Sequence, residues 1–153
     1  MKNVLILCTG NSCRSQIAEG WIRYYAGNEA DVFSAGIEAH GLNRYAVKVM
    51  AEAVIDISKQ KSKTVTDLPD IIFDYIITVC DNAKEKCPYF PGKGLRLHKS
   101  FTDPAAFKGT EEEILKQFSD LREEIEDYCF DFVHTYIRPL IPDDIDKLSR
   151  LID

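Results

Sequence analysis

Near the start of the chain, a cysteine and an arginine stand six positions apart, in a segment that runs from Cys8 to Ser15 with the sequence CTGNSCRS. The loop between them can wrap its backbone N–H groups around a tetrahedral oxyanion, and a helix that follows adds further donors. Arg14 can hold two oxygens of the same anion with its planar guanidinium. Because such surroundings lower the pKa of a thiol, Cys8 is expected to react as a thiolate, with Ser15 as a hydrogen-bond donor to its sulfur. The alternative is an inert cysteine at a strand end.

The chain has five cysteines, an odd number that a closed set of disulfides cannot use up. Taken singly, Cys80 is interpreted as a buried residue at a strand end and Cys87 as a loop thiol; together with Cys8 they are candidates for redox chemistry. A zinc site is disfavoured, because four and six residues separate the paired cysteines, whereas structural zinc pairs usually have about two to four. Cys13, inside the loop, and Cys129, on an apolar helix face, are interpreted as packing residues.

Strands and helices alternate along the chain. Short apolar runs predict strands at residues 3–7, 32–34 and 75–79, and residues 95–98 predict a fourth, weaker strand. Helical spacing predicts a helix from Arg14 to Gly27, a second capped by Asn43, and a long third that starts at a capping box of Thr110 and Glu113. Residues 81–88 and 143–153 also have helical potential.

This order of elements predicts a three-layer α/β fold with a central parallel four-stranded sheet flanked by helices. In such folds, ligands bind beyond the carboxyl ends of the strands. Cys8 and Cys80 each end a predicted strand, so the two thiols share one rim of the sheet if those strands are neighbours.

Composition limits the function classes. The chain has 153 residues, of which 45% are hydrophobic and 29% charged, which is typical of one soluble domain. No apolar run is long enough for a membrane helix, and the N-terminus lacks the features of a signal peptide. A net charge of −6 argues against nonspecific nucleic-acid binding. We therefore expect a monomeric, cytoplasmic protein that binds neither membrane nor nucleic acid.

Residues 8–20 resemble the phosphate loop of the thioredoxin-coupled arsenate reductases, which share the fold of the low-molecular-weight protein tyrosine phosphatases. Residues 34–41, 56–58 and 103–105 resemble the same family in the same order. The resemblance covers about residues 3–136. A single catalytic α/β domain is therefore expected at residues 1–136, and a C-terminal extension with a short helix at residues 137–153.

The resemblance implies that the protein reduces arsenate to arsenite, with two electrons supplied by two thiols that become one disulfide. In the family pattern Cys8 attacks arsenate, Cys80 attacks Cys8 as arsenite leaves, and Cys87 attacks Cys80. Thioredoxin then reduces the Cys80–Cys87 disulfide, and no bound cofactor is needed. Asp103 is the family-matched acid for the leaving oxygen. Oxyanion binding, with phosphate or sulfate as analogues of arsenate, is assigned to the loop: Thr9, Gly10, Asn11, Ser12, Cys13 and Arg14.

The sequence departs from the family pattern at one position. Some relatives hold a potassium ion at positions that match Asn11, Glu19, Ser34 and an acidic residue, and the last of these is Lys63 here. A lysine ammonium carries the same charge as the ion. We therefore expect no bound metal and an activity that does not depend on potassium.

The geometry of a helix adds a further prediction. Residues seven apart on an α-helix are separated by about 10.5 Å along its axis, whereas a disulfide needs Cα atoms within roughly 4.4–6.8 Å. Residues 81–88 are therefore expected to change conformation when Cys80 and Cys87 are oxidised.

Two other functions remain open. One is a tyrosine or small-molecule phosphatase, although Ala105 and Ala106 stand where the phosphatases tend to carry aromatic residues. The other is a thiol-based sensor that forms disulfides without turning over arsenate. The histidines, His40, His98 and His134, are interpreted as surface or packing residues.

Overall fold

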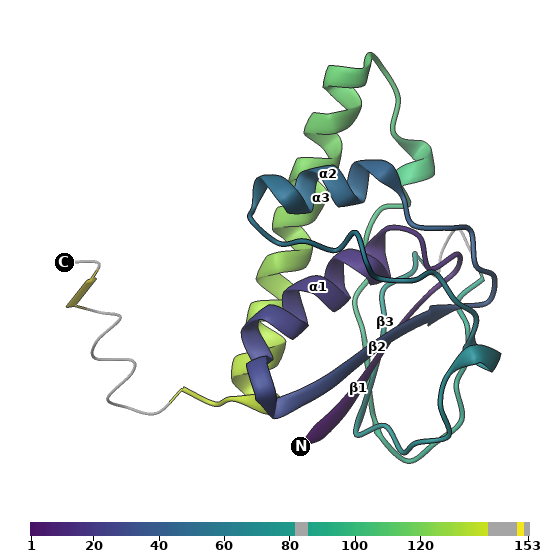
Figure 1. Ribbon diagram of the computed structural model, residues 1–153, viewed down its shortest axis with the longest axis vertical. Coiled ribbons are helices and arrows are strands. Elements are labelled where there is room, and N and C mark those ends of the chain that lie inside the picture. Colours follow the sequence, from purple (N-terminus) through teal and green to yellow (C-terminus); the bar gives the residue numbers. More distant parts are fainter. Residues whose placement is uncertain (82–85, 141–149, 152–153) are drawn as a thin grey trace.

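The computed structural model describes residues 1–81, 86–140 and 150–151. Its centre is a parallel sheet with the strand order β2-β1-β3-β4 (Figure 1). The strands are β1 (Lys2–Cys8), β2 (Ala30–Gly36), β3 (Tyr75–Thr78) and β4 (Leu95–His98). The predicted fold class and all four predicted strands are confirmed. β3 is one residue shorter than expected, although the N–H of Val79 still donates to the carbonyl oxygen of Leu7 on β1.

In the described part of the chain, three α-helices flank the sheet: α1 (Arg14–Ala26), α2 (Arg44–Glu52) and α3 (Glu111–Phe132), the last continuing into a π-helical turn at Val133–Ile137. The starts of α2 and α3 agree with the predicted caps. The side chain of Asn43 accepts from two N–H groups in the first turn of α2, and Thr110 and Glu113 form the expected capping box. These caps fix where α2 and α3 begin, and the buried residues of both helices join the core that α1 shares with the sheet.

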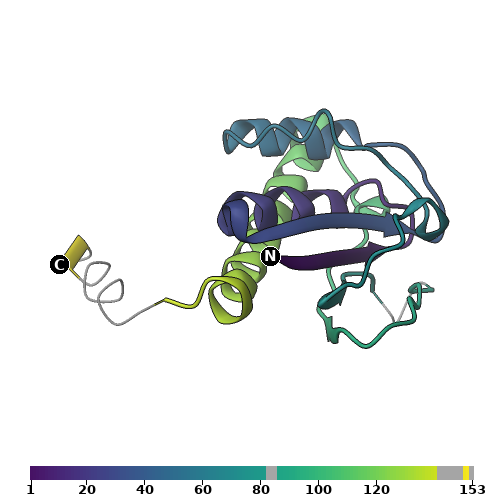
Figure 2. The same ribbon diagram turned by 60° about the horizontal axis from the view of Figure 1, so that its bottom comes forward.

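The two faces of the sheet are covered differently (Figure 2). Val4 and Ile6 of β1 face the large core, which α1, α2 and α3 complete with residues such as Trp21 and Ile125. Leu5 and Leu7 of β1 face a smaller cluster with side chains of β2 and β3, and the other described members of this cluster come from irregular segments and the short turn η2 (Val65–Asp67). Because β1 is buried on both faces, it is apolar without alternation, as expected for a central parallel strand.

This topology decides which residues meet. β1 pairs in parallel with both β2 and β3, so the loops after these strands lie at one rim.

Of the segment predicted to be helical at residues 81–88, Asp81 and residues 86–88 are not helical, and residues 82–85 lie outside the described part. The predicted short helix at residues 143–153 falls mostly outside the described residues, although Arg150 and Leu151 are helical. Among the described residues, none of the helices could cross a membrane.

Candidate active site

The loop between β1 and α1 is held from outside by the segment that follows β2. Three backbone N–H groups of residues 38–43 donate hydrogen bonds of 2.9–3.1 Å to carbonyl oxygens of residues 9, 10 and 12. Gly36 permits this close approach, because a Cβ there would lie 2.6 Å from the carbonyl oxygen of Thr9. With these carbonyls engaged on the outside, the loop can turn its N–H groups inward. No described side chain caps the start of α1, and such N-terminal N–H groups are donors for an anion.

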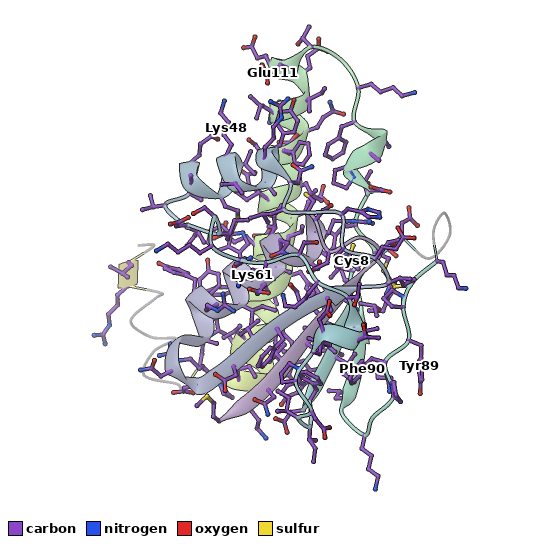
Figure 3. The ribbon with its side chains drawn as sticks, turned by 45° about the vertical axis from the view of Figure 1, so that its right-hand side comes forward. Cys8, Lys48, Lys61, Tyr89, Phe90 and Glu111 are labelled. Carbon is purple, nitrogen blue, oxygen red and sulfur yellow. A yellow bond between two sulfur atoms is a disulfide. The ribbon has the colours of Figure 1, made fainter. Side chains whose placement is uncertain are left out.

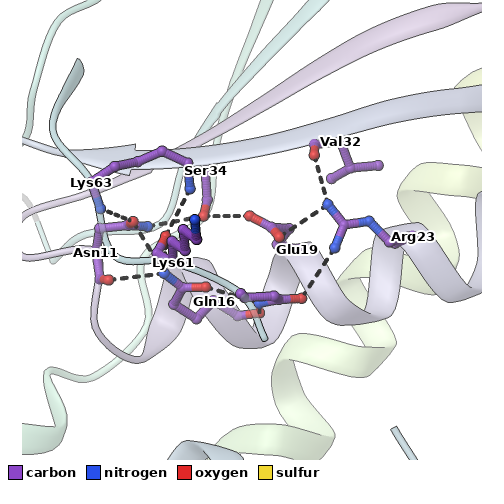
Figure 4. Close-up of polar contacts among 9 residues, drawn as sticks. Asn11, Gln16, Glu19, Arg23, Val32, Ser34, Lys61 and Lys63 are labelled. Atoms are coloured by element: carbon purple, nitrogen blue, oxygen red, sulfur yellow. Dashed lines mark hydrogen bonds and ion pairs between the residues drawn. The ribbon is translucent and has the colours of Figure 1, made fainter. Parts of the chain in front are cut away.

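Asn11 fixes the backbone of this loop. Its φ of 46° lies in the left-handed region, which asparagine adopts more readily than most residues. Its amide nitrogen donates to the hydroxyls of Ser15 at 2.8 Å and Ser34 at 2.9 Å. Its amide oxygen accepts from Nε2 of Gln16 at 3.1 Å and from the backbone N–H of Lys63 at 2.9 Å (Figure 4). Asn11 therefore ties the loop to α1, β2 and the segment before η2.

A pocket of about 400 Å³ opens over the loop. Arg14, only 4% exposed, donates from Nη1 to the carbonyl oxygen of Phe101 at 3.3 Å, and its Nη2 lies 3.9 Å from Oδ1 of Asp103. Asp103 caps the short turn Pro104–Ala106 by accepting from the N–H of Ala105 at 3.0 Å. Its carboxylate is 46% exposed, so it can exchange protons with water. The pocket thus combines a guanidinium with a carboxyl group, which suits oxyanion binding and proton donation.

The second and third thiols lie beside this pocket. Cys80 follows β3, is fully buried, and has its Sγ 3.9 Å from the carbonyl oxygen of Leu7, the residue before Cys8. A disulfide joins Cys80 to Cys87, with their Cα atoms 5.7 Å apart. The hydroxyl of Thr9 donates to the carbonyl of the residue before Cys87 at 3.3 Å. Figure 3 shows Cys8 at the rim of the sheet, on the same side of the molecule as the segment that follows Cys87.

The other two cysteines are held as protonated thiols. Cys13 lines the pocket, and burial, followed by the nearby Cys8, raises its pKa far above the usual range. Burial likewise raises the pKa of Cys129 on α3, whose Sγ lies 3.8 Å from the carbonyl oxygen of Ala18. Because the thiolate is the reactive form, both residues are suited to packing rather than nucleophilic attack.

The four positions compared with a potassium site come together around Ser34 (Figure 4). Ser34 donates to Oε1 of Glu19 at 2.6 Å, and Oε2 of Glu19 forms an ion pair with Arg23 at 3.0 Å. Asn11 turns its amide nitrogen, which cannot bind a cation, toward Ser34. Lys63 is half-buried and donates from Nζ to the carbonyl oxygen of Lys61 at 2.8 Å. Burial lowers the pKa of Lys63, and the charge of Glu19 opposes this shift.

These contacts do not fit a potassium ion. The oxygens of Asn11 and Glu19 are already engaged, and Lys63 brings a positive charge to the same place. Within the described residues, no group of three or more histidine, cysteine or acidic side chains could hold a metal ion. Replacement of the ion by the Lys63 ammonium remains a prediction.

Sequence reasoning missed several residues of the site. Gln16 is fully buried; its Nε2 donates to the backbone oxygens of Asn11 and Lys61, each at 3.1 Å. Nothing in the sequence distinguishes it from a surface glutamine. His40, expected at the surface or in packing, is half-exposed but also lines the pocket. An apolar wall was likewise not foreseen: Tyr45, Phe107, Ile114 and Phe118. These residues come from segments far apart in sequence, so no local pattern could reveal them.

Comparison with known proteins agrees with this geometry. The family model of the low molecular weight phosphotyrosine protein phosphatases matches residues 3–139. The chain belongs to this family. Its curated relatives include the arsenate reductases of Bacillus licheniformis, 51% identical, and Bacillus subtilis, 49% identical, each over 88% of this chain and 96% of the relative. The resemblance inferred from residues 8–20 is therefore confirmed.

Solved structures of the family agree with the fold. An arsenate reductase in its phosphate-binding state superposes with a TM-score of 0.72 at 25% identity, over 88% of this chain and 98% of that chain. A thioredoxin-dependent arsenate reductase of Corynebacterium glutamicum superposes with a TM-score of 0.57 at 28% identity, over 84% of this chain and 62% of that one. Membership of the family establishes the fold.

Proposed function

We propose that this protein reduces arsenate to arsenite by a relay of three thiols, Cys8, Cys80 and Cys87, and that thioredoxin regenerates it. The observation that carries the proposal is the Cys80–Cys87 disulfide beside the oxyanion pocket that contains Cys8. Phosphate-ester hydrolysis requires no second or third thiol. The names of the curated relatives support the same activity.

The first step is attack of the Cys8 thiolate on arsenic. The loop N–H groups and Arg14 hold oxygens of the anion, and they stabilise the charge that develops on it. Asp103 gives a proton to the oxygen that leaves as water. The product is a covalent adduct between the Cys8 sulfur and arsenic(V).

The second step transfers the two electrons. The Cys80 thiolate attacks the sulfur of Cys8, the sulfur–arsenic bond breaks, and its electron pair remains on arsenic, which leaves as arsenite. Cys87 then attacks Cys80, which forms the Cys80–Cys87 disulfide and releases the Cys8 thiolate. Arsenate and two thiols have then become arsenite, water and one disulfide, so atoms and electrons balance.

Regeneration by thioredoxin follows from the exposure of the disulfide. Cys80 is fully buried, whereas Cys87 is only half-buried and lies in a second pocket, of about 350 Å³. An external thiolate can therefore reach Cys87 and displace Cys80 as the leaving group. The proposal implies that thioredoxin forms a mixed disulfide with Cys87.

The test follows NADPH oxidation with thioredoxin and thioredoxin reductase, with and without arsenate. Wild type is expected to consume NADPH continuously only when arsenate is present. Cys87→Ser should complete at most one turnover per protein molecule, because no Cys80–Cys87 disulfide can form. Cys129→Ala serves as the matched control, since Cys129 is remote from the pocket, and it should keep multiple turnover. Arsenate-dependent multiple turnover by Cys87→Ser would refute the relay.

The alternative is a phosphatase, and the apolar wall that includes Phe107 and Phe118 favours it, because such a wall can pack on an aryl ester. A phosphatase would hydrolyse an aryl phosphate at the same rate in wild type and Cys87→Ser. Absence of arsenate-dependent NADPH oxidation together with rapid hydrolysis would establish this alternative. A thiol sensor would form the disulfide with neither activity.

A further inference from the structure

His40 lies against the oxyanion loop. Its backbone N–H donates to the carbonyl oxygen of Gly10 at 2.9 Å. Its ring lies over the same residue, because a Cβ at position 10 would collide with Nδ1 of His40. The imidazole also lines the pocket with Cys8, Arg14 and Asp103. The ring is therefore placed at the edge of the space that the oxyanion would occupy.

Glu38 determines which nitrogen of the ring faces the loop. Nε2 of His40 forms a short hydrogen bond with Oε2 of Glu38. An ionised carboxylate can only accept, so Nε2 carries a hydrogen and Nδ1 is the nitrogen on the side of Gly10. When the ring is protonated, Nδ1 becomes a donor as well. The His40 side chain is 53% exposed, so it can take up a proton directly from water.

The reaction requires more protons than Asp103 can give in one turn. Arsenate is mainly an anion at neutral pH, whereas arsenous acid is uncharged. Reduction of the arsenate dianion to arsenous acid, water and a disulfide takes up two protons in addition to those of the two thiols. Asp103 supplies one, to the leaving oxygen. A second donor beside the loop would allow the product to leave without charge.

Few other groups could provide this proton. The described titratable or charged side chains that line the pocket with His40 are Cys8, Cys13, Arg14, Tyr45 and Asp103. Cys8 is the nucleophile, and burial keeps Cys13 protonated. The Arg14 guanidinium does not lose its proton in proteins. The Tyr45 hydroxyl accepts from Nη2 of Arg44 at 2.8 Å, and a phenol is a much weaker acid than an imidazolium.

We propose that His40, oriented by Glu38, contacts the oxyanion through Nδ1 and gives it a proton as arsenite leaves. The contact is a property of the oxyanion site itself, and the proton transfer rests on the proposed arsenate reduction. When Cys80 attacks Cys8 and the electron pair passes to arsenic, an oxygen of the product takes the proton from Nδ1. Water then reprotonates the ring.

The contact is tested with sulfate, whose charge stays constant between about pH 5 and 9, in a Cys8→Ser background that removes the titration of the nucleophile. Sulfate affinity should fall about tenfold between pH 5.5 and 8.0, as expected for the loss of one nearby positive charge in a partly exposed site. Adding His40→Gln should abolish most of this fall, whereas His134→Gln, in the π-helical turn that follows α3, should leave it intact. A tenfold fall that persists in His40→Gln overturns the inference.

The proton transfer is tested by kinetics with Cys8 present. His40→Gln should lower kcat for arsenate by about tenfold or more, and Glu38→Gln should lower it less, because the ring remains but is no longer oriented. An unchanged kcat in His40→Gln refutes the proton transfer. If the Cys8→Ser protein binds sulfate with the expected pH dependence but wild type does not reduce arsenate, the proposed function fails and the His40 contact remains.

Discussion

Asn11 is the residue whose replacement should show most directly how the oxyanion loop is held. Its side chain makes four hydrogen bonds in a fully buried position. A buried hydrogen bond contributes about 0.5–1.5 kcal/mol net. Ser34 and Gln16 keep other partners after the substitution, so the loss per hydrogen bond lies in the lower half of that range. The four lost hydrogen bonds then lower the free energy of unfolding by about 3 kcal/mol in all. Alanine at the positive φ of this position adds about 1 kcal/mol of strain.

We therefore expect Asn11→Ala to lower the free energy of unfolding by about 4 kcal/mol. Asn11→Gly should be less damaging by about 1 kcal/mol, because glycine adopts the left-handed region without strain. The midpoint of thermal unfolding should fall by about 10 °C in the alanine variant. For arsenate, the KM should rise, because the loop N–H groups are no longer held in place.

The assay is urea unfolding of the reduced protein, followed by the fluorescence of Trp21. This is the single tryptophan of the chain and it is buried, so it reports on global unfolding. Asn28→Ala is the matched control, since Asn28 is exposed in the turn Gly27–Glu29, and it should change stability by less than about 0.5 kcal/mol. A loss below about 1 kcal/mol in Asn11→Ala, or equal stability of the alanine and glycine variants, would refute this account of the loop.

Three other predictions concern ions, oxidation and pH. The kcat/KM for arsenate should be the same in potassium and sodium salts at constant ionic strength, and Lys63→Ala should introduce a dependence on potassium; a several-fold activation of wild type by potassium would contradict the role of Lys63. Amide chemical shifts of residues 81–88 should differ between the reduced protein and the form with the Cys80–Cys87 disulfide; identical shifts would show that the segment does not rearrange. Burial raises the pKa of Tyr128 to about 12, against about 10 in an unfolded chain. The unfolded state therefore loses this proton first, and the stability that Tyr128 contributes, complete below about pH 10, declines between about pH 10 and 12. Absorbance at 295 nm should show late-titrating tyrosines, of which Tyr128→Phe removes one; Tyr25, whose pKa is also raised by burial and by Glu126, remains.

The sequence alone determined the order of the elements and the chemistry of the loop. β1, β2 and β3 appear as short apolar or β-branched runs and β4 as a weaker one, and the caps at Asn43 and Thr110 depend on residues only a few positions away. The oxyanion loop from Cys8 to Arg14 could be recognised from the sequence, because the thiol, the turn and the start of the helix all lie within one short segment. Such features are readable because the interactions that cause them are short in sequence.

Only the tertiary structure decided which distant residues meet at that loop. The placement of β3 next to β1 brings Cys80 beside Cys8. The segment that follows β2 returns along the outer side of the oxyanion loop, where residues 38–43 bond to it. The position of His40 over Gly10 depends on this return, and the hydrogen bond from Gln16 to Lys61 and the wall around Phe118 depend on further contacts between distant segments. Hydrogen bonds and packing between segments 20 to 100 residues apart leave no periodicity in the sequence. Each of the residues involved would fit its local order of apolar and polar positions equally well if it lay on the surface.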